Sequence, residues 1–279
     1  MAHRRPAALL CLALVVHATA AGADPTRRVV SLNPSLTAIL LALGGGDSLV
    51  GVDDYSSRQE PAVAHLPTVG GLFNPSLESV VALEPDVVAL VPGAQQRALR
   101  ARLETLGVAV LELPNIELEQ LIASIETLGE LVGRRAAASA RIAEIRRAWQ
   151  EVSDASAGQP RLRVALVLQR DPLYLVGSGS FLDSMLQAAG ADNVAAQFPD
   201  PYPTAALEWL IAAAPEVILD ASEGGSDVQQ FWSRWPSLPA VASGRVVAIP
   251  ATQVTLPGPY PDRALRLIAE SIRKAGAAP

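Results

Sequence analysis

Short apolar runs alternate along the chain with longer segments in which apolar residues recur every three or four positions. The apolar runs cover residues 28–32, 49–52, 87–91, 108–113, 163–168, 217–219 and 245–249. Such runs are typical of strands that are buried on both faces of a parallel sheet. The helical pattern covers residues 35–43, 94–106, 117–132, 180–189, 205–214, 226–234 and 262–274. This alternation predicts an α/β fold with mainly parallel sheets.

One segment of the chain occurs twice. Residues 77–90 read LESVVALEPDVVAL and residues 207–220 read LEWLIAAAPEVILD, so that identical or similar residues recur at an offset of 130. The match places Glu78 and Glu208 at equivalent positions. A self-match on this scale indicates a chain built from two similar halves.

Helix starts repeat as well. Asn33-Pro34 follows the first apolar run and predicts an N-cap with proline at the first helical position. Residues 74–77 repeat the same NPSL letters, so a second helix is expected to start there. Gly44-Gly45-Gly46 predicts the end of the first helix.

A long helical segment separates the two halves. Residues 134–152 are rich in Ala, Arg and Glu and contain neither Gly nor Pro, which favours a continuous helix of about 28 Å. We therefore predict two Rossmann-like lobes, residues 24–133 and 161–279, joined by a single long α-helix over residues 134–153. Residues 153–160 are predicted to form a loop. The alternative is that the helix belongs wholly to one lobe.

The N-terminal residues resemble an export signal. Residues 1–23 combine His3, Arg4 and Arg5 with a short apolar core and small residues suited to cleavage. The apolar core is about half of the ~20 residues that span a bilayer. Cys11, the only cysteine, lies within this segment. We expect a cleaved signal peptide and a periplasmic mature chain without disulfides.

The net charge of the chain indicates which kinds of partner it can have. The chain has a net charge of −6, and removal of residues 1–23 takes away two arginines and no acidic residue, which leaves −8. A nucleic-acid partner would call for a basic footprint, so none is expected. We expect a monomer.

Catalytic patterns are largely missing from the sequence. His65 is the only histidine after residue 23, and a metal cluster needs several converging ligands. Residues 177–180, GSGS, have the wrong spacing for a G-x-S-x-G nucleophile elbow. The glycines at 44–46 follow a helix, whereas those of a dinucleotide motif precede one. We expect no catalytic residue, no metal site and no resident cofactor.

Glu78 and Glu208 have two interpretations. A carboxylate in the first turn of a helix is favoured by the helix dipole, by about 0.3–1 kcal/mol, without any further role. Two carboxylates at equivalent places on two lobes would instead form a paired docking surface for arginines of a partner. The duplication favours the second interpretation.

Aromatic residues gather in the segments that follow the predicted strands. Ligands of α/β sheets bind at the carboxyl ends of the strands, and aromatic side chains with polar tips suit a large, partly apolar ligand. The residues in these segments are Tyr55, Phe73, Tyr174, Tyr202 and Tyr260.

Four segments together resemble one family. They are residues 28–56, 69–88, 173–196 and 201–219, and within them GGLFNPSLE at 70–78 and PYP at 201–203 are the most distinctive. The chain resembles the periplasmic substrate-binding proteins of ABC importers for cobalamin and iron complexes, the cobalamin-binding branch in particular. The resemblance implies two α/β lobes bridged by one helix. It also implies capture of a ligand without chemistry and delivery to a membrane permease.

The resemblance also implies roles for particular residues. The family's two permease-docking glutamates fall on Glu78 and Glu208. The ligand, cobalamin or another corrinoid, is expected to meet Tyr55, Phe73, Gln169, Arg170, Tyr174, Tyr202 and Arg263. Leu72 and Val91 stand where tryptophan can occur in the family, so the pocket is less aromatic than in some members. A haem or ferric-siderophore binding protein and an exported enzyme are the alternatives.

Overall fold

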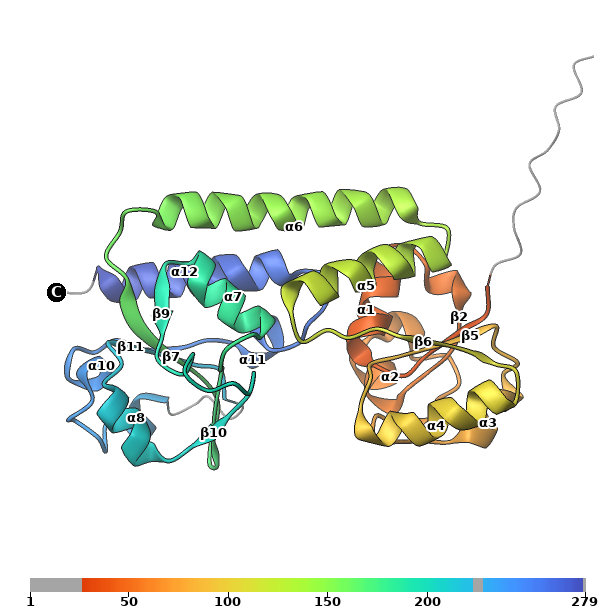
Figure 1. The fold of residues 1–279 in the computed structure, drawn as a ribbon, viewed down its shortest axis with the longest axis horizontal. Coiled ribbons are helices and arrows are strands. Elements are labelled where there is room, and N and C mark those ends of the chain that lie inside the picture. Colours follow the sequence, from red (N-terminus) through yellow and green to blue (C-terminus); the bar gives the residue numbers. More distant parts are fainter. Residues whose placement is uncertain (1–26, 223–227, 278–279) are drawn as a thin grey trace, which may run out of the picture.

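Each half of the chain builds its own β-sheet, because the apolar runs of one half pair only with one another. The computed structural model describes residues 27–222 and 228–277. It shows two α/β lobes, the N-lobe and the C-lobe, lying side by side beneath one long helix (Figure 1). This confirms the predicted fold class. The predicted signal peptide lies outside the described residues, and no described helix has the length and apolarity needed to cross a membrane.

The N-lobe holds a four-stranded sheet in the order β2-β1-β5-β6, with every pair parallel. Its strands are β1 (Val29–Ser31), β2 (Leu49–Val52), β5 (Val87–Leu90) and β6 (Ala109–Glu112). Its helices are α1 (Pro34–Ala42), α2 (Asp54–Gln59), α3 (Leu77–Ala82), α4 (Ala94–Thr105) and α5 (Leu118–Leu131). Short elements complete the lobe: the 3-10 turns η1 (Gly46–Ser48) and η2 (Pro61–Val63) and the small strands β3 (Gly70–Gly71) and β4 (Asn74–Pro75).

The C-lobe sheet has the order β10-β8-β7-β11-β12, and β9 pairs with the first residues of β7. Its strands are β7 (Leu162–Arg170), β8 (Leu173–Leu175), β9 (Ala191–Asn193), β10 (Thr204–Ala205), β11 (Val217–Asp220) and β12 (Val246–Ala248). Its helices are α7 (Phe181–Ala188), α8 (Leu207–Ala213), α9 (Val228–Trp232), α10 (Pro239–Ala242), α11 (Ala251–Val254) and α12 (Pro261–Gly276). Only β8 and β10 run antiparallel to their neighbours.

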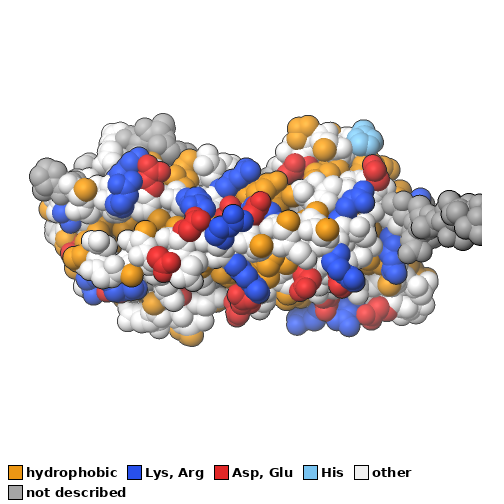
Figure 2. Space-filling model, turned by 90° about the horizontal axis from the view of Figure 1, so that it is seen from above, with side chains coloured by type: hydrophobic (Ala, Val, Ile, Leu, Met, Phe, Trp, Pro, Cys, Tyr) orange, Lys and Arg blue, Asp and Glu red, His pale blue; other side chains and the backbone are white. Residues whose placement is uncertain are grey.

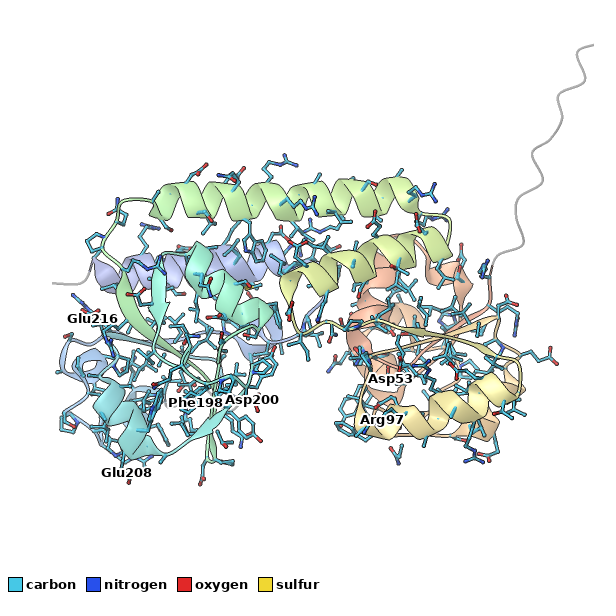
Figure 3. All side chains as sticks on the ribbon, in the orientation of Figure 1. Asp53, Arg97, Phe198, Asp200, Glu208 and Glu216 are labelled. Carbon is cyan, nitrogen blue, oxygen red and sulfur yellow. The ribbon has the colours of Figure 1, made fainter. Side chains whose placement is uncertain are left out.

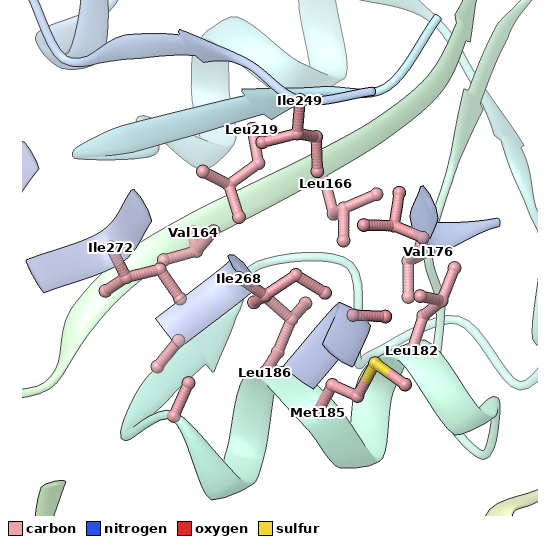
Figure 4. Close-up of a cluster of buried hydrophobic side chains, with 14 of the residues drawn as sticks. Val164, Leu166, Val176, Leu182, Met185, Leu186, Leu219, Ile249, Ile268 and Ile272 are labelled. Carbon is pink, nitrogen blue, oxygen red and sulfur yellow. The ribbon is translucent and has the colours of Figure 1, made fainter. Parts of the chain in front are cut away.

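Aliphatic side chains fill both faces of each sheet. In the C-lobe, Val164, Leu166 and Leu219 pack against α7 and α12 through Leu186 and Ile268 (Figure 4). All five side chains are at most 1% exposed. Burying one such side chain is worth about 1.5–3 kcal/mol. The C-lobe core also contains two fully buried aromatic side chains, Phe181 and Trp232.

The long helix α6 (Arg135–Ser156) contacts both lobes. It lies along α5 of the N-lobe and along α12 and α7 of the C-lobe. Trp149 of α6 and Leu118 of α5 pack against the hydrophobic cores of both lobes. The helix continues through Ser156, further than the sequence pattern predicts, and Gly158 follows with φ +75. Because α6 packs on both cores, the alternative that it belongs to one lobe is wrong.

The second NPSL segment starts a helix, as predicted, but two residues later than the first NPSL segment does. Asn74 and Pro75 form β4, which pairs antiparallel with Gly70 and Gly71. Helix α3 therefore starts at Leu77, and Ser76 caps it by accepting a hydrogen bond from the backbone N–H of Ser79. At Gly70 φ is +101, a conformation that suits glycine and that brings the chain back on itself. The same four letters therefore start a helix at Pro34 in one place, and in the other they form a short strand before the helix starts at Leu77.

The duplicated segment adopts the same structure twice. In both lobes, a non-glycine residue with φ 46 follows the helix; Glu84 occupies this place after α3, and Ala214 follows α8. Arg28 and Arg163, at the starts of their sheets, donate hydrogen bonds to backbone carbonyls at the ends of these helices. Asp86 in turn accepts from the backbone N–H of Arg28 at 2.7 Å, as Glu216 does from that of Arg163 at 2.9 Å. The two halves are therefore equivalent in their contacts as well as in sequence.

We predict that Ala214→Gly stabilises the protein. A left-handed conformation costs a residue with a Cβ about 1–2 kcal/mol, and glycine avoids this cost. The free energy of unfolding, measured by urea denaturation, should rise by about 1 kcal/mol. The matched control is Ala212→Gly inside α8, which should lower it by about 1 kcal/mol. Equal losses in both variants would show that the conformation at Ala214 carries no strain.

Candidate functional site

In each lobe, the loops that follow the strands face the other lobe. In the N-lobe, Asp53 follows β2 and lies on the side toward the C-lobe, together with Arg97 of α4 (Figure 3). Asp200 of the C-lobe lies on the side toward the N-lobe. In the C-lobe, the residues that follow β7, β11 and β12 line a pocket of 540 Å³. The site therefore lies at the carboxyl ends of the strands, where α/β folds bind ligands.

The pocket of 540 Å³, the hairpin pocket, is formed mainly by the β7–β8 hairpin. Its polar wall consists of Gln169, Arg170 and Asp171, and Ser222 and Thr255 close the other side. Amide, guanidinium and hydroxyl groups in one cavity suit a ligand rich in hydrogen-bonding groups.

Arg170 is held by a buried carboxylate. Its Nε donates to Oδ2 of Asp220 at 2.9 Å, and its guanidinium lies over the ring of Phe231 at 4.9 Å. Asp220 is 1% exposed and also accepts from Nε1 of Trp232 at 2.6 Å and from the backbone N–H of Ser222 at 3.0 Å. Nη2 of Arg170 is buried and has no hydrogen-bond partner among the described residues. The guanidinium is thus fixed on one edge by Asp220, while its buried Nη2 is left without a described partner.

Tyr55 is positioned by a buried polar cluster in the N-lobe. Asp53 is 0% exposed and accepts from the backbone N–H groups of Tyr55 at 2.9 Å and Ser56 at 3.0 Å, which caps α2. The hydroxyl of Ser56 donates to Asp53 and lies 2.9 Å from that of Thr37. The carboxylate of Asp53 is thus buried and fixes the start of α2.

The predicted ligand residues of the C-lobe lie close together. Tyr174 of β8 stands opposite Gln169 of β7 and Thr204 of β10. Tyr202, two residues before β10, is partly buried, and burial raises the pKa of its phenol to about 12. Its phenol is therefore neutral at physiological pH.

The other predicted residues are spread over both walls. Tyr55 is 44% exposed and has Arg58 over its ring at 4.8 Å, and Phe73, in the turn between β3 and β4, is 66% exposed. Arg263 does not join the hairpin pocket. It lies on α12 and stacks on Tyr260 at 3.9 Å, in a second cavity between the lobes.

Polar contacts at the hinge, the region where the two lobes meet, hold the lobes together. The hydroxyl of Ser35 at the start of α1 donates to the carbonyl of Pro257 in the C-lobe. Arg141 of α6 forms an ion pair with Asp262 and donates to the carbonyl of Pro259 at 2.7 Å. The backbone N–H of Phe181 donates to the carbonyl of Ile116 at 2.7 Å. Local sequence patterns do not reveal these contacts, because each partner is more than 60 residues away from the other.

Metal ligands do not converge within the described ranges. Residues 27–222 and 228–277 contain no group of three or more His, Cys, Asp or Glu side chains placed to hold a metal ion. His65 is exposed, in the loop after η2.

Comparisons with known proteins agree with this architecture. The family model described as "Periplasmic binding protein" matches residues 29–252. A cobalamin-binding protein of Halobacterium salinarum is 28% identical over 244 residues, which are 83% of this chain and 65% of that protein. The chain thus spans slightly less than two thirds of the length of that relative.

Solved structures show the same fold. The periplasmic vitamin B12 binding protein BtuF of Vibrio cholerae superposes with a TM-score of 0.79 at 23% identity, over 91% of this chain and 99% of that one. The periplasmic haem-binding protein BhuT, solved with two haems, superposes with a TM-score of 0.77 at 28% identity, over 90% and 99%.

We predict that Arg170→Gln lowers the free energy of unfolding by about 3 kcal/mol, because it leaves the buried Asp220 carboxylate without its cation. The neighbouring control Gln169→Ala, at an exposed position, should change it by at most about 0.5 kcal/mol. Urea denaturation of both variants provides the measurement. Wild-type stability in Arg170→Gln would show that Asp220 does not depend on this ion pair.

Proposed function

Because the chain belongs to the periplasmic binding protein family, we propose that it is the substrate-binding component of an ABC importer and that its ligand is cobalamin or a related corrinoid. The observation that carries the ligand class is the hairpin pocket of the C-lobe, which combines amide, guanidinium and hydroxyl groups with an exposed aromatic ring, that of Tyr174, on the same hairpin. A corrinoid has the matching character, since its broad ring is apolar and its rim carries many amides. Membership of a family of binding proteins also supports the prediction that the chain is not an enzyme.

The polar groups of the hairpin pocket suit the rim of a corrinoid. Gln169 can donate to side-chain amide carbonyls, and the hydroxyls of Ser222 and Thr255 can accept from amide nitrogens. Tyr174 and Tyr55, exposed by 38% and 44%, offer ring faces to the corrin.

The mechanism is capture and hand-over without a chemical step. The mature protein, released by cleavage of residues 1–23, binds its ligand between the lobes in the periplasm. Because α6 packs on both lobes and Arg141 and Ser35 tie the hinge, opening and closing are limited to small changes of angle.

Glu78 and Glu208 suit a docking role. Each lies in the first turn of its helix, is exposed, and takes part in no ion pair within the described residues. Figure 1 places α3 and α8 at the ends of their lobes that lie away from α6, and Figure 3 shows Glu208 at this extremity. Two uncompensated carboxylates on one side of the molecule form a symmetric target for arginines of a permease. The opposite side, seen in Figure 2, carries acidic and basic side chains in mixture.

Haem is the second candidate ligand, because the haem-binding protein BhuT shares the fold at 28% identity. A haem site would call for an iron ligand, and His65, the only histidine after residue 23, lies in the loop after η2.

We predict that the purified protein binds cyanocobalamin with a Kd of about 1 μM or below. Titration calorimetry gives the affinity, and absorbance separates corrinoid bands from those of haem. Tyr174→Ala should weaken binding by about tenfold through loss of a ring contact. Leu106→Ala serves as the control, since Leu106 is exposed at the end of α4. Saturable haem binding without corrinoid binding would overturn the proposed ligand.

We predict that Glu78→Gln combined with Glu208→Gln leaves the affinity for cyanocobalamin unchanged and reduces its uptake by at least about tenfold, because a lost pair of charge contacts costs several kcal/mol at a docking interface. Uptake of radiolabelled cyanocobalamin is measured in cells that depend on this protein. The control replaces two exposed glutamates on the α6 side, Glu126→Gln with Glu270→Gln. Normal uptake in the first double variant would exclude the docking role.

A further inference from the structure

A second cavity lies between the lobes. It has a volume of 590 Å³, within the range of about 300–1,000 Å³ that is usual for small-molecule sites. One wall comes from α1 and the end of α2 in the N-lobe, and the other from α11, the following loop and the start of α12 in the C-lobe. We call it the hinge pocket, because Ser35 and Arg141 hold the loop that lines it.

A single turn of chain separates the hinge pocket from the hairpin pocket. Ala251 and Thr255 line the hairpin pocket, whereas Thr252, Gln253 and Leu256 line the hinge pocket. These residues belong to α11 and its immediate continuation. A ligand large enough to cover this turn can reach both cavities at once.

The two pockets differ in chemistry. The hairpin pocket is lined largely by polar groups. The hinge pocket has apolar walls formed by Leu41, Leu256 and Pro259, together with one acidic and one basic side chain, Glu60 and Arg263. An aromatic base attached to a sugar and a phosphate combines these requirements, since the base fits the apolar wall, a sugar hydroxyl can donate to a carboxylate, and a phosphate pairs with a guanidinium.

Arg263 has a charge that the protein does not neutralise. Its contact among the described residues is with the ring of Tyr260, at 3.9 Å, and it takes part in no ion pair there. Arg141, which lies over the same ring at 5.0 Å, is paired with Asp262 and Glu144. Of these two arginines beside Tyr260, Arg263 is therefore the one available to an anionic ligand group.

We propose that the hinge pocket holds the nucleotide tail of the corrinoid, with the base against the apolar wall and the phosphodiester at Arg263. This inference rests on the proposed function and adds a specificity to it: the protein prefers complete corrinoids over those that lack the nucleotide. The corrin amides occupy the hairpin pocket on the other side of the α11 turn.

The test compares cyanocobalamin with dicyanocobinamide, which has the corrin ring and no nucleotide. Titration calorimetry on the full mature chain should show that the wild type binds cyanocobalamin at least about tenfold more tightly, as expected for one charge-assisted contact and a buried base. Ala42→Phe fills the hinge pocket from an exposed position on α1, and Arg263→Gln removes its charge. Each variant should lose most of this preference and bind dicyanocobinamide as the wild type does.

Matched controls test whether the effect is local. Ala136→Phe places the same ring on an exposed position of α6, and Arg273→Gln removes an exposed charge from α12 two to three turns beyond Arg263. Both should keep the wild-type preference. Equal affinity of the wild type for the two corrinoids, or a preference that survives in Ala42→Phe and Arg263→Gln, would overturn the hinge-pocket assignment alone. Failure to bind either corrinoid would overturn the proposed function itself.

Discussion

The packing of α6 against two separate cores is the constraint on which the rest of the structure depends. Trp149 and Leu118 contact the hydrophobic clusters of both lobes, so a change in the angle between the lobes must disturb at least one of them. Interiors are packed too densely to absorb such a change without loss of contacts. The ion pair between Arg141 and Asp262 joins α6 to the start of α12 near the same place. The cleft is thus held nearly in its final shape before a ligand arrives, which lowers the free-energy cost of ordering on binding.

The duplication accounts for the equivalent positions of α3 and α8, but it does not account for the residues between the lobes. Arg28 and Arg163 bind the ends of their helices in the same way, and Glu84 and Ala214 share one unusual backbone conformation. These contacts fix α3 and α8 relative to their sheets. The position of the first-turn glutamates follows from this arrangement, since each lies on a helix that is anchored identically at its other end.

Much of the architecture could be predicted from the sequence because it depends on local patterns. The buried runs correspond to the parallel strands, and Asn33 caps α1 by accepting from the backbone N–H of Ser35 as its spacing predicts. The second NPSL segment starts its helix two residues later than the first, because Asn74 and Pro75 pair with Gly70 and Gly71. The burial of Asp220 beneath Arg170 also escaped prediction, since it depends on Trp232 and Phe231 from a segment further along the chain.

The candidate site was harder to predict than the fold for the same physical reason. Tyr174 and Gln169 could be assigned to one region because they are close in sequence, and the hairpin places them opposite each other. Glu60 and Arg263 line one cavity although they come from different lobes, and no periodicity relates them. The part of the site within one lobe can be predicted from local structure. The part between the lobes depends on how α6 positions the two lobes relative to each other. Equivalent lobes can therefore present unlike walls to a ligand, and this asymmetry suits a ligand whose two faces differ in chemistry.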